Sequence, residues 1–223
     1  VLEAARRTGV KKVVSFLSTC IFPALAQYPL TEDQLHNGQP HDSNFGYGHA
    51  KRMLEVHSRA IATQYGLNYT CIIPTNIYGP NDNFNLENSH VLPALIHKCY
   101  LAKRDNTDLV VWGSGEPLRE FIFSKDVGEI TQLILEHYEG TEPMILSTSE
   151  EISIRKAVET IADVMGFEGN LIFDSTKPDG QYKKPTSNLR LRNFLPNYKF
   201  TPFREGIKQT VDWFIENYET CRR

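Results

Sequence analysis

The 223-residue chain is 40% hydrophobic and 23% charged, which is the composition of a globular protein with a core of its own. Its formal net charge is −3, and its 24 Lys and Arg residues are scattered among 27 Asp and Glu residues. It therefore lacks the basic stripe that binds nucleic acid, and no apolar run reaches the roughly 20 residues that a membrane span needs. We expect neither a nucleic-acid partner nor a membrane partner.

Patterns of β-strands and α-helices alternate along the chain. Residues 1–9 have the pattern of the last turns of a helix that Gly9 terminates, and the β-branched run in residues 12–18 predicts a buried central strand. The elements predicted after it are, in chain order, helix 47–65, strand 69–73, helix 91–103, strand 108–112, helix 126–138, strand 144–147, helix 153–166, strand 171–174 and helix 203–218. Such alternation is typical of an α/β fold with a mainly parallel sheet.

Tyr47 and Lys51 are four residues apart within the helix predicted over 47–65, so they share one helical face. A nearby ammonium group stabilises a phenolate and makes tyrosine a better proton donor at neutral pH. The spacing alone also fits a packed aromatic side chain beside a solvated charge. Ser18, at the end of the strand predicted upstream, and the segment PTNIYGP downstream favour the catalytic interpretation.

This arrangement resembles the extended short-chain dehydrogenase/reductases that act on nucleotide sugars. Six segments in the same order are similar to the GDP-L-fucose synthases of that family: STCIFP, NFGYGHAKRM, PTNIYGPNDNFN, HVLPALIHK, WGSGEPLREFI and KPDGQYKK. The resemblance implies a Rossmann-like, mainly parallel sheet, incomplete at the N-terminus, with a smaller α/β substrate-binding domain. Residues 1–83 are expected to form the latter part of the NADP-binding domain. Residues 84–223 are expected to form mainly the GDP-sugar domain, with parts of 120–150 returning to the first domain.

The resemblance also implies an activity, which is C3/C5 epimerisation of GDP-4-keto-6-deoxy-D-mannose and NADPH-dependent reduction of its C4 ketone. Ser18 would hydrogen-bond the C4 oxygen, Tyr47 would protonate it, and Lys51 would bind the nicotinamide ribose and tune the phenol. Cys20 and His90 would be the acid and base at C3 and C5, because a thiol and an imidazole both titrate near neutral pH.

Further binding residues follow from the same resemblance. The residues expected to contact NADP(H) are Tyr47, Lys51, Pro74, Thr75, Asn76, Ile77 and His90. The residues expected to contact the GDP-sugar are Lys98, Trp112, Arg119 and Asp179. Arginine suits phosphate because its planar fork binds two oxygens, and tryptophan suits a base because it stacks. No metal site is expected, because the histidines show neither HxH nor HExxH spacing.

Several of these residues have structural alternatives. Cys20 follows a buried strand and has the character of a small core hydrophobe, and His90 precedes a helix that it or Ser89 could cap. Arg119 also fits a surface charge, and Trp112 also fits a core position.

Two other functions stay open. A nucleotide-sugar 4-epimerase of the same superfamily would keep Ser18, Tyr47 and Lys51 and would make Cys20 and His90 dispensable. A non-catalytic module that binds a GDP-sugar or another subunit is the second alternative. A 4,6-dehydratase is disfavoured, because Thr19 and Cys20 offer no carboxyl group after Ser18.

Neither Gly46-x-Gly48 nor Gly113-x-Gly115 continues as a GxGxxG phosphate loop between a first strand and helix. The sequence is therefore expected to be a fragment that lacks this loop and is impaired as a reductase. A homodimer is expected from the family and from an apolar face of helix 47–65, formed by Met53, Leu54, Val56 and Ile61. The same face also fits burial within the chain. The four cysteines form no CxxC pair, so reduced thiols and a cytoplasmic location are expected.

Overall fold

A computed structural model describes residues 1–223 and divides the chain into two compact units. Unit 1 comprises Val1–Thr75, Asp126–Ser149 and Pro185–Lys199. Unit 2 comprises Asn76–Lys125, Glu150–Lys184 and Phe200–Arg223. Each unit is thus assembled from three separate stretches of the chain. None of the helices combines the length and apolar character that crossing a membrane would require.

The sheet of unit 1 is three-stranded and entirely parallel, in the order β1-β2-β6. Its strands are β1 (Lys12–Phe16), β2 (Asn68–Pro74) and β6 (Met144–Leu146). β2 is paired on both sides and its side chains are buried from Tyr69 onward, as expected of a strand covered on both faces. The prediction that the first strand is central is therefore wrong for this chain, in which β1 lies at the edge of the sheet and β2 lies in the middle.

β1 also ends at Phe16, two residues before the predicted end of that strand. Beyond it, Ser18 begins a short 3₁₀ turn over Thr19–Ile21, and the Ser18 hydroxyl oxygen accepts a hydrogen bond from the backbone N–H of Cys20 at 3.2 Å. Serine side chains compete in this way with regular backbone pairing. The hydroxyl and thiol therefore lie in a turn beyond the strand rather than within it.

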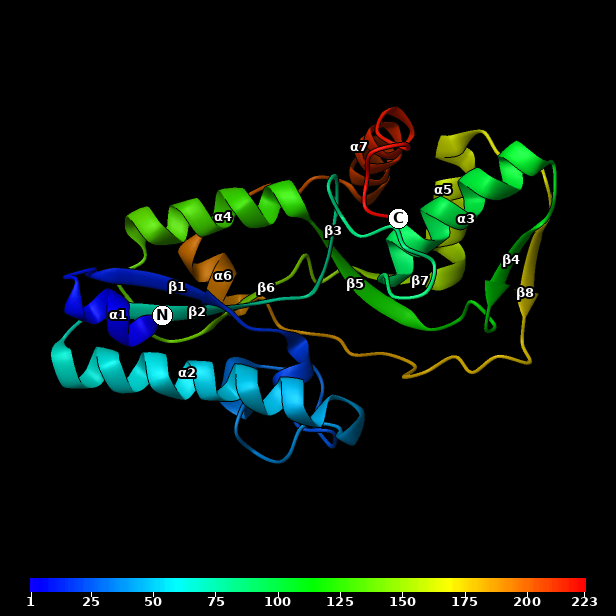
Figure 1. Ribbon diagram of the computed structural model, residues 1–223. Helices are drawn as coiled ribbons and strands as arrows, with labels where there is room; N and C mark the ends of the chain where they lie inside the picture. The colour runs from blue at the N-terminus through cyan, green and yellow to red at the C-terminus, as the bar shows by residue number, and fades with distance from the viewer. The chain divides into compact units, whose positions relative to one another are not determined.

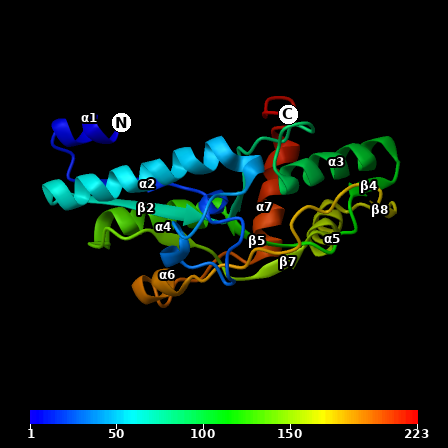
Figure 2. The same ribbon diagram turned by 90° about the horizontal axis from the view of Figure 1, so that it is seen from below.

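The helices of unit 1 cover both faces of this sheet. They are α1 (Leu2–Arg7), α2 (Phe45–Tyr65), α4 (Ser124–His137) and α6 (Leu189–Phe194). In Figures 1 and 2, α2 runs along one face of the sheet and α4 lies on the opposite face. α2 ends at Gly66, whose φ of 65° is left-handed, as the sequence predicted.

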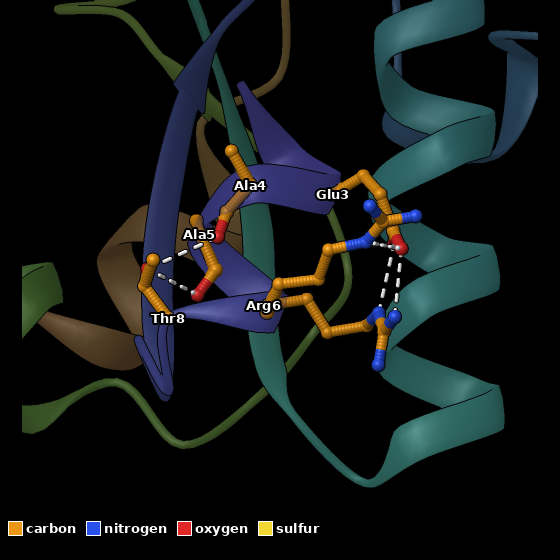
Figure 3. Close-up of polar contacts among 6 residues, drawn as sticks. Glu3, Ala4, Ala5, Arg6 and Thr8 are labelled. Carbon is orange, nitrogen blue, oxygen red and sulfur yellow. Dashed lines mark hydrogen bonds and ion pairs between the residues drawn. The ribbon is translucent and has the colours of Figure 1, made fainter.

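The first helix, α1, is tied by local polar contacts (Figure 3). The carboxylate of Glu3 accepts hydrogen bonds from Arg6 at 2.7 and 2.8 Å and from Arg7 at 2.9 Å, and these bonds lower the pKa of Glu3 to about 2. The Thr8 hydroxyl donates to the carbonyl of Ala4 at 3.0 Å. Gly9 follows with a φ of 81°, which confirms that it terminates the helix.

Unit 2 contains one mixed three-stranded sheet and one separate parallel pair of strands. The strands are β3 (Asn76–Tyr78), β5 (Leu118–Phe123) and β7 (Glu151–Ser153) in the first sheet, with β4 (Leu109–Trp112) and β8 (Leu171–Asp174) in the pair. The helices are α3 (Val91–Asp105), α5 (Ile154–Met165) and α7 (Phe203–Glu216). The sequence did not predict β3, β5 or β7, because they mix polar and apolar residues, whereas the similarly short β4, β6 and β8 carry continuous apolar runs.

An aromatic cluster forms part of the core of unit 2. Phe214, on α7, is completely buried, and its ring centroid lies 4.5 Å from that of Phe84 and 5.6 Å from that of Tyr100. Offset and edge-to-face aromatic pairs of this kind add to the energy of area burial. α7 is thereby held against α3 and the segment that precedes it.

Substitution Phe214→Ala is expected to lower the free energy of unfolding by about 3–5 kcal/mol, because it leaves a cavity among the surrounding rings. Ile215→Ala, at the next position of α7 where the side chain is 45% exposed, is the control and should change the free energy by about 0.5 kcal/mol or less. Urea denaturation followed by circular dichroism measures both values. Equal losses for the two variants would contradict the described core.

Candidate active site

The polar end of β1 carries the first group of predicted site residues. Ser18 and Cys20 are partly exposed, and the Cys20 thiol is not in a disulfide. Because the Ser18 oxygen accepts the Cys20 N–H, its hydroxyl proton remains directed elsewhere and can be donated to a ligand. Partial exposure of Cys20 does not fit the alternative in which it is a small core hydrophobe.

Helix α2 brings Tyr47 and Lys51 together on one face, as their spacing predicted. The Lys51 Nζ lies 5.9 Å from the centre of the Tyr47 ring and donates a hydrogen bond of 2.7 Å to the carbonyl of Phe16. Half of the Tyr47 surface is exposed, so the phenol is not a packed core aromatic. The lysine therefore joins the tyrosine to the end of β1, where Ser18 follows.

Gly48 is a residue of this site that the sequence reasoning missed. A side-chain Cβ at this position would lie 2.8 Å from the Cβ of Pro40 and 3.1 Å from the carbonyl oxygen of Cys20. Only a glycine lets the helix backbone come this close to the Cys20 turn. The signal in the sequence was a glycine within a helical pattern, which costs about 1 kcal/mol relative to alanine and calls for a packing reason.

The residues after β2 fall in both units. In unit 1, Pro74 pairs with Leu146 of β6, and the backbone N–H of Thr75 donates to the carbonyl of Leu146 at 3.0 Å. In unit 2, the side chain of Asn76 donates to the carbonyl of Glu120 at 2.8 Å, and Ile77 is paired within β3. These contacts fix the backbone of the segment expected to line the nicotinamide pocket.

His90 is the N-cap residue of α3, but its side chain makes no capping hydrogen bond and is exposed. The helix-capping alternative for this imidazole is therefore wrong. His90 interacts electrostatically with Asp82 instead: burial raises the pKa of the Asp82 carboxyl, and the Asn83 N–H and the charge of His90 act against that rise. The imidazole thus stands exposed with a half-buried carboxyl group nearby.

Trp112 is 65% exposed at the end of β4, which excludes the core position that was its alternative. Two lysines face its ring, with Lys98 Nζ 4.5 Å and Lys177 Nζ 5.7 Å from a ring centroid. Burial lowers the pKa of Lys98. Lys177 was not predicted as a site residue, because a lysine in a loop shows its aromatic partner only when the chain is folded.

Asp179 lies in the loop after β8, and Arg119 lies on β5; both belong to unit 2. Both carboxylate oxygens of Asp179 accept hydrogen bonds from Ser114, one from its backbone N–H at 2.7 Å and one from its hydroxyl at 2.8 Å. Gly113 has a φ of 88°, and a Cβ there would collide with Asp179. Arg119 donates to the carbonyl of Leu118 at 2.7 Å, and burial lowers the pKa of its guanidinium group.

Comparison with known proteins identifies the family. Residues 1–147 match the NAD dependent epimerase/dehydratase family. The GDP-L-fucose synthase of Dictyostelium discoideum is 50% identical over 225 residues, which cover 100% of this chain and 70% of that protein. The chain belongs to the GDP-L-fucose synthase family. The family resemblance and the Rossmann-like α/β class that the sequence predicted are confirmed.

A further relative and two solved structures are also similar to this chain. The GDP-L-fucose synthase of Escherichia coli is 36% identical, with 100% of this chain and 72% of that protein covered. The crystal structure of a GDP-L-fucose synthetase from Naegleria fowleri bound to NADP has a TM-score of 0.96 and 48% identity, and the match covers 100% of this chain and 71% of that chain. A UDP-glucose 4-epimerase from Thermotoga maritima shares the fold, with a TM-score of 0.81 and 21% identity over 98% of this chain and 68% of that chain.

The close approach at Gly48 gives a testable prediction for this protein. Gly48→Ala should lower the free energy of unfolding by about 1–3 kcal/mol, because its Cβ has no room beside Pro40 and the Cys20 carbonyl. Gly46→Ala is a matched control in the same helix, where an added Cβ meets nothing within 4 Å, and should be neutral or stabilising by up to about 1 kcal/mol. Thermal and urea unfolding of both variants test the difference, and a stabilised Gly48→Ala protein would refute the described packing.

Proposed function

We propose that the protein catalyses GDP-L-fucose synthesis from GDP-4-keto-6-deoxy-D-mannose, by epimerisation at C3 and C5 and NADPH-dependent reduction of the C4 ketone, with reduction impaired in a chain that lacks the GxGxxG loop. The observation that carries this proposal is the cluster at the end of β1, where a hydroxyl, a thiol, a phenol and an ammonium group are held by adjoining backbone contacts. It occurs in a chain that is 50% identical along its whole length to a GDP-L-fucose synthase.

In the reduction, three side chains act on the C4 oxygen. Tyr47 donates its phenolic proton to that oxygen, and the free proton of the Ser18 hydroxyl hydrogen-bonds the same atom. Lys51 stabilises the resulting phenolate by its positive charge. NADPH supplies the hydride that arrives at C4.

In the epimerisation, the ketone acidifies the protons on the neighbouring C3 and C5 carbons. Removal of either proton places negative charge on the C4 oxygen, where the donors Ser18 and Tyr47 stabilise it. Cys20 and His90 provide the two groups that remove and return protons. The thiol is partly exposed in unit 1 and the imidazole is exposed in unit 2, so both are accessible to a ligand.

Lys51 and Tyr47 on α2 fit the nicotinamide half of NADP. Lys51 gives one hydrogen bond to Phe16, and an ammonium group has three N–H bonds, so donors remain for ribose hydroxyl groups. Tyr47 exposes half of its surface on the same helical face. We propose that Pro74, Thr75, Asn76, Ile77 and His90 complete the cofactor contacts, as the sequence predicted.

The GDP half of the substrate is assigned to unit 2. Trp112 presents an exposed ring on which a purine can stack, and Lys98 and Lys177 bring positive charge to that ring, as a diphosphate requires. Arg119 supplies a guanidinium group, whose fork binds phosphate oxygens in pairs. Asp179 supports the substrate site in two ways. It fixes its own loop to Ser114, and the remaining lone pairs of its carboxylate oxygens can accept hydrogen bonds from the sugar or the guanine.

The two chemical steps can be separated by substitution. With the substrate and NADPH in D₂O, Cys20→Ser should slow deuterium entry at C3 and C5 at least about 100-fold and should largely spare reduction at C4, whereas Tyr47→Phe should slow reduction about 10²–10⁴-fold. Cys221→Ser, in the last turn of unit 2, is the matched control and should change neither rate. Proton NMR follows the three carbons in one experiment.

The same spectra distinguish the alternatives. Turnover that Cys20→Ser leaves unchanged, with no deuterium entering C3 or C5 in either protein, would favour a nucleotide-sugar 4-epimerase. Absence of any change at C3, C4 or C5 with the unmodified chain, while GDP still binds in calorimetry, would favour a non-catalytic binding module.

We further propose that the protein is a cytoplasmic homodimer that pairs through α2. Of the four apolar residues predicted to form this face, Met53 and Val56 are 64% and 38% exposed and support pairing. Ile61 is only 3% exposed and Leu54 packs against the core, so these two residues are buried within the chain instead. Reduced thiols support the cytoplasm, since all four cysteines are free in the structure.

Met53→Glu is expected to raise the dimer dissociation constant at least about 100-fold, because it places a charge in an apolar interface with no partner. Leu189→Glu changes a residue of similar exposure, 65%, on α6 and should leave the dimer intact. Sedimentation equilibrium measures the constants. A monomeric unmodified protein at micromolar concentration would contradict the dimer proposal.

A further inference from the structure

Arg52 of α2 is a charged side chain that the proposed chemistry does not use and that is nevertheless 91% buried, with a relative exposure of 9%. Its Nε donates a hydrogen bond of 2.6 Å to the carbonyl of Ile21, and its Nη1 donates one of 2.5 Å to the carbonyl of Gly38. Its Nη2 is buried and makes no hydrogen bond. Arg52 forms no ion pair, so two backbone carbonyls hold the cation.

Burying an unpaired cation is expensive, and burial accordingly lowers the pKa of the Arg52 guanidinium group. A leucine or methionine would fill a similar volume without this cost. The carbonyls that Arg52 contacts belong to two loop segments that no strand pairs, the turn at Ile21 and the loop at Gly38. The guanidinium group is therefore suited to fixing backbone positions, because its planar fork directs donors in fixed directions.

The contacts of α2 lie at both ends of the segment that carries Ser18 and Cys20. Lys51 and Arg52 are consecutive on α2 and donate to the carbonyls of Phe16 and Ile21, which lie on either side of Ser18 and Cys20. Between these two contacts, the backbone of Gly48 abuts the Cys20 carbonyl. α2 thus holds the polar segment at both ends and leaves room for its middle.

We propose that Arg52 is a positioning residue that sets the direction of the Cys20 thiol by fixing the carbonyl of Ile21, the next residue in the chain. This inference rests on the proposed role of Cys20 in C3/C5 epimerisation. Ser18 and Tyr47 are held by other contacts, namely the strand end and the helix itself. Loss of the Arg52 contacts should therefore affect epimerisation more than reduction.

The test compares Arg52→Lys with Arg59→Lys. Lysine keeps the charge but reaches one carbonyl where arginine reaches two. Arg59 lies on the same helix, is 60% exposed and pairs with Glu55, so its replacement is a matched control. We expect Arg52→Lys to slow deuterium entry at C3 and C5 at least tenfold, to leave C4 reduction within threefold, and to preserve the unfolding midpoint within a few degrees. Arg59→Lys should change neither rate.

A second readout needs neither substrate nor cofactor. The alkylation of Cys20 by iodoacetamide, followed by peptide mass spectrometry, should become at least fivefold faster in Arg52→Lys, because the turn that carries the thiol is then held by fewer hydrogen bonds. Cys221 in the same sample is the internal reference. If Arg52→Lys fails to fold, Arg52→Gln takes its place, since the amide keeps an N–H donor without a buried charge.

The outcomes separate this inference from the function on which it rests. If Cys20→Ser abolishes exchange and Arg52→Lys leaves both exchange and alkylation unchanged, the positioning role is wrong and the proposed function stands. If exchange and reduction fall in equal proportion and alkylation of Cys20 is unchanged, Arg52 serves the fold alone. If Cys20→Ser leaves exchange intact, the epimerase role of Cys20 is wrong, and the alkylation rate still reports whether Arg52 fixes the turn.

Discussion

The constraint on which the rest of unit 1 depends is the close contact between α2 and the segment that follows β1. Ser18 and Cys20 follow a parallel strand and therefore lie at the carboxyl edge of the sheet. There, a short 3₁₀ turn replaces further strand pairing and provides backbone hydrogen bonds. That turn keeps its geometry because Lys51 donates to the carbonyl before it and because a glycine of α2 leaves room for it. Acid–base chemistry needs this preorganisation, since proton transfer depends on positions within a few tenths of an ångström.

In unit 2, two lysines, one from a helix and one from a loop, are gathered around an aromatic ring at the end of a strand. Trp112 ends the short strand β4 and is faced by Lys98 from α3 and by Lys177 from the loop after β8. The hydrogen bonds between Asp179 and Ser114 tie that loop to the turn after Trp112. Cations over an exposed ring gain from its quadrupole and still keep their charge available for an anionic ligand.

The long amphipathic helices and the chemistry-bearing residues were accessible from the sequence, because periodicity, Gly66 at a helix end and the Tyr47–Lys51 spacing are local signals. The strands β3, β5 and β7 were not, because their sequences mix polar and apolar residues and only partners elsewhere in the chain identify them as strands. The same reason hid Arg52, whose partner Ile21 is 31 residues away. A lysine such as Lys177 likewise shows no role until folding places it over a ring.

Proton exchange beside the ketone and reduction of the ketone are both assigned to this one protein. The most direct test is the mass and the NMR spectrum of the sugar nucleotide that the unmodified protein forms from GDP-4-keto-6-deoxy-D-mannose and NADPH in D₂O. We expect a reduced product with solvent deuterium at both C3 and C5 and with the configuration of GDP-L-fucose. A reduced product without deuterium at either carbon, or with unchanged configuration there, would contradict this assignment.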